Sequence, residues 1–176
     1  MPDCYYTTYS IGGLTTRKQR EKIADILSAN RGVNYGNKSN NFIEAMEESI
    51  NRGLVLVESF EEAAWGRIEE LELFLEKHHI AYSKHVSGDC EYSAEVVLFD
   101  GVNTYQSEAG EDGIPMVSVD AVRKALANNS LDALLFKADV AAGDPPALYD
   151  VSKGNPTASA SRRTMKNWRR QLCKAA

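Results

Sequence analysis

The stretch from residue 54 to residue 100 constrains the fold most, because it encodes a strand, a helix and a return strand in succession. It opens with four apolar residues, 54–57, the length of a short strand. Ser59, followed three residues later by Glu62, forms a capping-box pattern that predicts a helix start. An apolar stripe at helical spacing then follows: Phe60, Ala64, Ile68, Leu71 and Leu75. We therefore expect a helix that begins after Ser59 and ends near His79.

The segment after this helix predicts a hairpin and a third strand. Residues 80–86 and 92–99 both have strand composition, and a Ser-Gly-Asp-Cys turn separates them. Asp100-Gly101 follows, and Asp-Gly between extended runs is the strongest short hairpin signal. We expect a third antiparallel strand over residues 102–106. Because crossovers in one sheet are right-handed and join parallel strands, residues 54–86 are predicted to form one βαβ crossover.

The segments before residue 54 predict a strand and two capped helices. Residues 4–11 are rich in Tyr and Thr and alternate as a strand does. Thr16, with Gln19 three residues later, predicts the first helix start. Asn41 predicts the second start and Gly53 the end of that helix. Residues 31–41 form a polar loop of turn-forming residues.

The segments after residue 113 predict a helix and short strands. Ser118 or Asp120 caps the helix, which runs to about residue 128. Residues 131–140 fit a strand or a helix, and we favour a strand; residues 148–151 read as another short strand. This order of elements predicts an α+β fold, a mostly antiparallel sheet with helices packed on it.

The length and the distribution of charge suggest one domain with a basic tail. A chain of 176 residues can bury a core without metal or disulfide support. We expect a domain over residues 1–152, a linker over 153–161 and a basic amphipathic helix over 162–176. The net charge of −5 divides into +3 over residues 1–40, −15 over 41–150 and +7 over 151–176. Such segregation concerns binding partners rather than fold.

The composition favours a soluble cytoplasmic protein that does not bind membranes. The longest apolar runs are far too short to span a bilayer, and we expect no signal peptide. The three cysteines, Cys4, Cys90 and Cys173, are odd in number and far apart, which favours reduced thiols.

The pair of residues that most suggests catalytic chemistry is Cys90 with His85. Asp89 adjoins the thiol in the predicted turn, and His85 lies on the strand that leads into it. A Cys–His nucleophile requires the imidazole within hydrogen-bond reach of the sulfur. No family signature surrounds these residues, so the ordinary interpretation is a surface cysteine in a turn.

Two further patterns carry weaker chemistry. His78 and His79 lack the paired spacing of zinc ligands, and at a helix end they more simply complement the negative end of the helix dipole. We predict no metal and no cofactor. Residues 11–16 join a strand to a helix start beside Arg17, Lys18 and Arg20, where a phosphate could bind. The glycine spacing matches no nucleotide-binding motif, and an exposed basic face is the simpler interpretation.

The acidic residues of the predicted long helix are the first candidate for partner binding. Solvated carboxylates usually serve solubility, but a dense negative face can also dock a basic partner. The residues that we assign to such a face are Glu62, Glu69, Glu70, Glu72 and Glu76. Asp100, Glu108, Glu111 and Asp112 form a second acidic cluster in later loops.

The basic tail is the second candidate for binding. Met165, Trp168 and Leu172 form a short apolar stripe. The residues that we assign to nucleic-acid or partner binding are Arg162, Arg163, Lys166, Trp168, Arg169 and Arg170. The protein's own acidic body, a second copy, a protein partner and nucleic acid all remain open as destinations.

From these features we expect a non-catalytic binding protein, of inhibitor or adaptor type, that docks a protein partner by charge complementarity through the acidic helix face. Two alternatives stay open: a nucleic-acid-binding protein that uses the tail, and a small enzyme built on Cys90 and His85. The sequence also leaves open a homo-oligomer.

Overall fold

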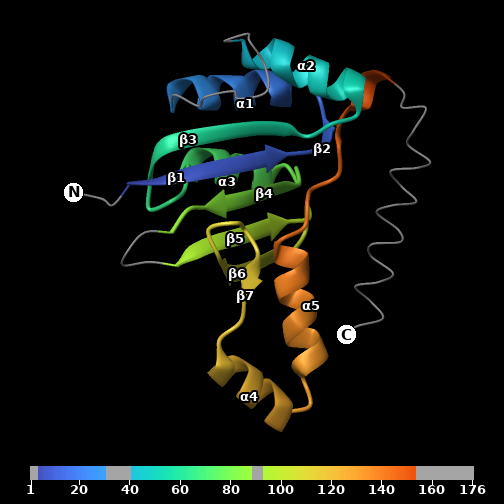
Figure 1. The fold of residues 1–176 in the computed structure, drawn as a ribbon. Coiled ribbons are helices and arrows are strands. Elements are labelled where there is room, and N and C mark those ends of the chain that lie inside the picture. Colours follow the sequence, from blue (N-terminus) through green and yellow to red (C-terminus); the bar gives the residue numbers. More distant parts are fainter. Residues whose placement is uncertain (1–3, 31–40, 89–92, 154–176) are drawn as a thin grey trace.

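The computed structural model describes residues 4–30, 41–88 and 93–153 (Figure 1). The predicted loop over residues 31–40, the turn at 89–92, most of the linker and the basic C-terminal helix lie outside the described residues. Among the described residues, no helix is long and apolar enough to cross a membrane.

The main sheet has six strands in the order β3-β1-β4-β5-β6-β7, and every neighbouring pair is antiparallel. Its strands are β1 (Cys4–Ile11), β3 (Leu56–Ala64), β4 (Tyr82–Val86), β5 (Ala94–Phe99), β6 (Thr104–Ala109) and β7 (Pro115–Met116). A separate parallel pair joins β2 (Gly13–Thr15) to β8 (Leu148–Asp150). The predicted α+β fold with a mostly antiparallel sheet is confirmed.

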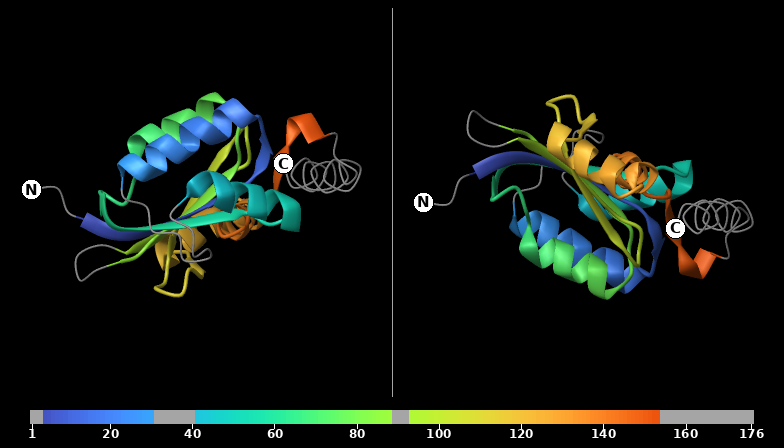
Figure 2. Two further views of the ribbon diagram at one scale, coloured as in Figure 1. Left: turned by 90° about the horizontal axis from the view of Figure 1, so that it is seen from above. Right: turned by 90° about the horizontal axis from the view of Figure 1, so that it is seen from below.

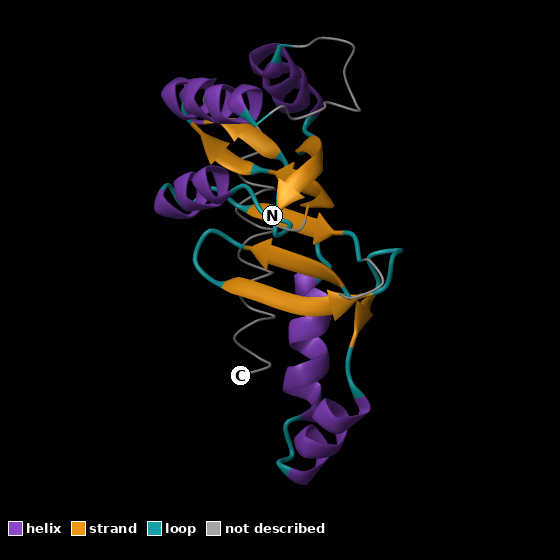
Figure 3. Cartoon of the chain, turned by 90° about the vertical axis from the view of Figure 1, so that its left-hand side faces the viewer, coloured by secondary structure: helices purple, strands orange, loops and turns teal. Residues whose placement is uncertain are grey.

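Helices cover both faces of this sheet. They are α1 (Arg17–Ala29), α2 (Phe42–Arg52), α3 (Glu69–Lys77), α4 (Val119–Ala127) and α5 (Leu131–Ala141), with a short 3₁₀ turn at Val151–Lys153. Helices α1 and α3 lie side by side on one face, and α5 lies on the other (Figure 2). Helix α4 projects past the sheet edge beyond β7 (Figure 3).

The βαβ crossover is present in a split form. Both β3 and β4 pair antiparallel with β1, which lies between them, so β3 and β4 are parallel to each other. Helix α3 connects them across the face that α1 also covers (Figure 1).

The helix predicted between Ser59 and His79 is wrong in its first half. Strand β3 continues to Ala64, and α3 begins only at Glu69. The Ser59 hydroxyl does not cap a helix but makes a 3.0 Å hydrogen bond with the Thr8 hydroxyl of β1. Leu56, Glu58 and Phe60 are buried at the two-residue period of a strand, which outweighs the helical stripe.

The strand favoured for residues 131–140 is also wrong, because these residues form α5. The apolar residues of this helix lie on most of its sides, so its sequence shows little helical periodicity. Its small side chains Ala138 and Ala141 are buried, and Ala141 packs against Ala94 and Val96 of β5. Close packing on the sheet selects the helix here.

Most of the predicted helix ends are confirmed. Thr16 and Gln19 form the capping box of α1, and the Asn41 side chain caps α2. Gly53 ends α2 in the left-handed region at φ 65°, where glycine is the least strained residue. Of the two caps proposed for α4, Ser118 is the one observed.

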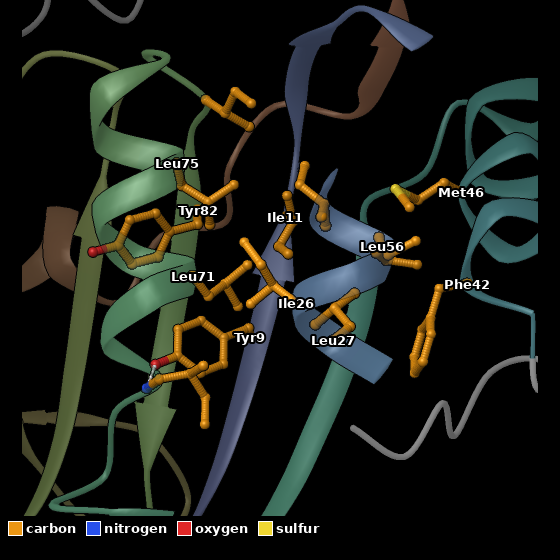
Figure 4. Packing of buried hydrophobic residues seen from close by; sticks show 14 of the residues in the cluster. Tyr9, Ile11, Ile26, Leu27, Phe42, Met46, Leu56, Leu71, Leu75 and Tyr82 are labelled. Carbon is orange, nitrogen blue, oxygen red and sulfur yellow. Dashed lines mark hydrogen bonds between the residues drawn. The ribbon is translucent and has the colours of Figure 1, made fainter. Parts of the chain in front are cut away.

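The larger core lies between the sheet and the helices α1, α2 and α3. Tyr9 and Tyr82 of adjacent strands are buried there, and Phe60 meets the Tyr9 ring edge-on at 5.7 Å. Figure 4 shows the packing of these strands against the helices. The apolar residues that the helices contribute to this core include Ile23, Ile26, Leu27, Met46, Leu71 and Leu75.

The Asp100-Gly101 turn joins β5 to β6 as predicted, and the Asp100 side chain holds it closed. Its Oδ1 atom accepts hydrogen bonds from the amides of Val102 at 2.8 Å and Asn103 at 2.7 Å. Replacing Asp100 with alanine is expected to lower the free energy of unfolding by about 1 kcal/mol, because both amides lose an acceptor. Thermal unfolding measures this loss. Asp100→Asn keeps an acceptor and should retain most of the stability; equal losses in both variants would contradict this role.

Candidate functional site

Glu72, assigned to the acidic outer face, is buried instead. Its side chain is 8 % exposed, and Oε1 accepts hydrogen bonds from the Tyr9 hydroxyl at 2.6 Å and from Lys84 Nζ at 3.1 Å. Arg67 approaches Oε2 at 3.4 Å. The Glu72 carboxylate therefore connects α3 to β1 and β4 and cannot contact a partner in this arrangement.

The same network fixes the start of α3. The Tyr9 hydroxyl accepts a 2.9 Å hydrogen bond from the amide of Ile68, the residue just before the helix. Burial raises the pKa of the Tyr9 hydroxyl, and the Glu72 carboxylate raises it further, so Tyr9 stays protonated and donates to Glu72. The amide–hydroxyl–carboxylate chain thereby orients the turn that precedes α3.

The other four residues of the predicted face divide between interior and surface. Glu76 is half-buried and accepts a 3.1 Å hydrogen bond from the Tyr82 hydroxyl. Glu69 and Glu70 are exposed, and Glu70 lies 2.9 Å from Lys22 of α1. Glu62 lies in β3, and its side chain is outside the described part of the structure. Two carboxylates, Glu69 and Glu70, thus remain at the surface of α3.

The turn before α3 carries an exposed tryptophan that the sequence pattern does not reveal. Trp65 is 61 % exposed in the tight turn between β3 and α3, and its φ of 55° is unusual for a bulky side chain. Gly66 follows at φ 65°, and a Cβ there would lie 2.4 Å from Val86 Cγ1, so this position requires glycine. The apolar stripe in the sequence predicts a continuous helix through residue 65 and therefore does not indicate this turn.

Trp65 lies in the turn that leads into α3, four residues before Glu69. Leu73, 57 % exposed, follows Glu69 by four residues and Glu70 by three, so the three side chains share one helix face. We call the set of Trp65, Glu69, Glu70 and Leu73 the Trp65–α3 surface. It combines an aromatic side chain, an aliphatic side chain and two carboxylates.

Of the catalytic candidates, His85 lies among the described residues. His85 lies on β4 and points to the face of the sheet that α5 covers. Cys90 and Asp89 lie outside the described residues, so their approach to His85 stays a prediction. The tail residues Arg162, Arg163, Lys166, Trp168, Arg169 and Arg170 also lie outside them.

The adjacent histidines His78 and His79 make contacts within the fold. His78 ends α3 and packs on Phe74 at 4.5 Å between ring centroids, while His79 Nδ1 lies 2.8 Å from the Gly101 carbonyl. Within the described ranges, no group of three or more His, Cys, Asp or Glu side chains could hold a metal ion.

Arg20, predicted beside a phosphate, is buried. It forms a 2.8 Å ion pair with Asp150, which ties α1 to β8. Burial alone raises the pKa of Asp150, but hydrogen bonds from Ser152 and Arg20 outweigh burial and hold the pKa at about 2. Arg20 is thus committed to the fold.

No family model matches this chain, and neither the curated proteins nor the solved structures include a match. A function can therefore be inferred only from the side chains and surfaces described above.

Proposed function

We propose that this protein is a non-catalytic binding protein, of inhibitor or adaptor type, that docks a basic protein partner through the Trp65–α3 surface. The observation that carries the proposal is Trp65, 61 % exposed in a left-handed turn four residues before Glu69, the first exposed carboxylate of α3. The proposal retains the expected docking by charge complementarity, and it limits the docking surface to residues that face solvent.

An exposed tryptophan on a rigid turn suits protein binding. Tryptophan is among the residues most enriched where single side chains dominate binding energy, since it buries a large area with few rotatable bonds. Backbone in a sparsely populated region persists when its surroundings determine it, and it concentrates at functional sites. Gly66 against Val86 and the Ile68 amide on Tyr9 supply that support. The turn therefore presents Trp65 in a fixed position, which reduces the entropy lost on binding.

The carboxylates define the chemistry of the partner. Glu69 and Glu70 share a helix face with Leu73 and favour a partner that presents Lys or Arg. The Lys22–Glu70 pair is half-exposed on both sides, so a partner's cation can replace Lys22 at little cost. Charges at the edge of an interface act mainly on specificity and association rate, while the buried aromatic side chain contributes most of the affinity.

Capture of a partner by the purified full chain tests the proposal. Trp65→Asn keeps a residue that tolerates positive φ but removes the ring, and it should lower the capture of a given partner at least tenfold, about 1.4 kcal/mol. The double reversal Glu69→Lys/Glu70→Lys should lower it similarly and select against basic proteins. Quantitative mass spectrometry of proteins co-purified from native extract measures both effects.

The matched control makes the same charge change on the other face of the sheet. Asp132→Lys/Asp139→Lys alters two exposed carboxylates of α5 and should leave capture unchanged. If the α3 and α5 reversals reduced capture equally, or if Trp65→Asn captured the same partners at wild-type yield, the proposed surface would be wrong.

A further inference from the structure

A small pocket with a mixed polar and apolar lining lies on the opposite face of the sheet from the Trp65–α3 surface. It has a volume of about 200 Å³ and lies between strands β1 and β4 and the carboxyl end of α5. Pockets for drug-sized ligands usually measure about 300–1,000 Å³, so this one suits a smaller molecule or the end of a side chain.

The floor of the pocket is a square of four polar side chains. The register of β1 with β4 places Ser10 opposite Ser83 and Thr8 opposite His85. Paired residues on one face of an antiparallel sheet have Cβ atoms about 5 Å apart, so these groups can contact one ligand together. On the neighbouring strand β5, Val96 pairs with His85 and adds an apolar side chain to the pocket lining, while Ala94 and Val96 both belong to the small apolar cluster with Ala141 of α5.

The roof of the pocket is electronegative. Ala141, Ala142 and Gly143 line it where α5 ends, and a helix carries partial negative charge at its carboxyl end. Asp144 adds an exposed carboxylate at the same end. Lys84 borders the pocket, but its ammonium group lies on the other face of the sheet, bonded to Glu72. The pocket thus offers acceptors and a carboxylate.

His85 carries an unused hydrogen-bonding atom at this floor. Its Nε2 atom is buried and has no hydrogen-bond partner among the described residues. The turn at Gly113 covers the imidazole ring. A Cβ atom built on Gly113 would lie 3.9 Å from the Cε1 and Nε2 atoms of His85, which is an ordinary van der Waals contact. An unsatisfied buried nitrogen is costly, and a ligand N–H group that displaces the covering turn can satisfy it when the imidazole proton is on Nδ1.

We propose that this pocket binds a guanidinium or primary ammonium group. Such cations present several N–H donors and no acceptor, which matches hydroxyl oxygens, a carboxylate and helix-end carbonyls. The planar guanidinium, with its fixed fork of donors, fits the paired serines and Asp144 best. The carrier is a small free cation or an arginine side chain of a peptide, and the two are distinguished by experiment.

Titration of the full chain with agmatine, which carries both cationic groups, tests this site. The imidazole proton signals of His85 report binding by NMR. Agmatine should shift them saturably at millimolar concentration, and 4-guanidinobutanoate, which replaces the ammonium by a carboxylate, should bind at least fivefold more weakly. Acetyl-Gly-Arg-Gly-amide is the peptide arm: tighter binding than agmatine identifies a peptide carrier, and weaker binding identifies a free small molecule.

Variants localise the effect. Ser10→Ala/Ser83→Ala and, separately, Asp144→Asn should each weaken agmatine binding at least fivefold, while Ser28→Ala on the surface of α1 should leave it unchanged. Because Asp144 is exposed, Asp144→Asn is expected to fold, so it still tests the site if the Ser10→Ala/Ser83→Ala variant does not fold. The proposal is overturned if neither agmatine nor the peptide shifts His85 saturably, or if Asp144→Asn binds agmatine as the wild type does.

Discussion

Replacing Glu72 with leucine is expected to lower the free energy of unfolding by about 3–5 kcal/mol, because breaking a buried ion pair leaves its partner charged in the interior. Lys84 is 9 % exposed, and its Nζ lies 3.1 Å from Glu72 Oε1. A second carboxylate, that of Glu95, is more distant at 3.9 Å and cannot replace it fully. The Tyr9 hydroxyl also loses its acceptor. Urea unfolding at neutral pH, followed by circular dichroism, measures the loss.

Two variants separate this network from a general effect of charge on α3. Glu72→Leu/Lys84→Met removes both charges and should recover most of the lost stability, since apolar replacements of a buried pair are often neutral. Glu70→Leu on the exposed side of the helix should change stability by less than about 0.5 kcal/mol. A Glu72→Leu variant as stable as Glu70→Leu would show that the carboxylate has no structural role.

Glu58→Met is expected to stabilise the protein at neutral pH by about 3 kcal/mol. Glu58 pairs with Tyr9 across strands β3 and β1, is 0 % exposed, and has no hydrogen-bond partner for either oxygen among the described residues. Burial raises the pKa of its carboxyl group to about 8. An apolar side chain of similar length removes both the unpaired oxygens and the cost of ionising them.

The sign of the pH dependence distinguishes this explanation from simple repacking. Between the ordinary pKa of 4.5 and the folded value of about 8, the folded state holds a proton that the unfolded state has released. The stability of the wild type should therefore fall as pH rises through this window and level off above it, with a slope of at most about 1.4 kcal/mol per pH unit.

Chemical unfolding at pH 5, 6, 7 and 8 measures the difference between the wild type and Glu58→Met. The difference should grow by about 3 kcal/mol from pH 5 to pH 8. Glu47→Met, at an exposed position of α2, should show no such growth. Parallel curves for the wild type and Glu58→Met would show that Glu58 does not titrate in this range.

Local signals in the sequence were sufficient for much of the fold. Caps such as Thr16 and Asn41, the Gly53 helix end and the Asp100-Gly101 turn depend on neighbours within a few residues, and all are observed. The errors occur where tertiary contacts decide. Ser59 had two competing uses, as a cap or as a strand residue, and its bond to Thr8, 51 residues away in sequence, selects the strand. Residues 131–141 have too little periodicity to indicate their structure without the sheet on which they pack.

The binding surfaces depended even more on tertiary structure. A carboxylate such as Glu72 looks solvated in sequence, because nothing local shows that Lys84 and Tyr9 will enclose it. Trp65 became a candidate only when the turn between β3 and α3 placed it in solvent. The polar square at Thr8, Ser10, Ser83 and His85 requires the register of two strands, which alternation alone cannot supply.

Site-specific photocrosslinking at residue 65 tests the proposed docking most directly. The full chain carries p-benzoylphenylalanine in place of Trp65 or, as a control, in place of Val102, which is 63 % exposed in the hairpin turn between β5 and β6. We expect crosslinking at residue 65 to one partner through a peptide rich in Lys and Arg, and loss of that product with Glu69→Lys/Glu70→Lys. Equal crosslinking at both positions, or a product at residue 65 that persists through the charge reversal, would contradict docking through the Trp65–α3 surface.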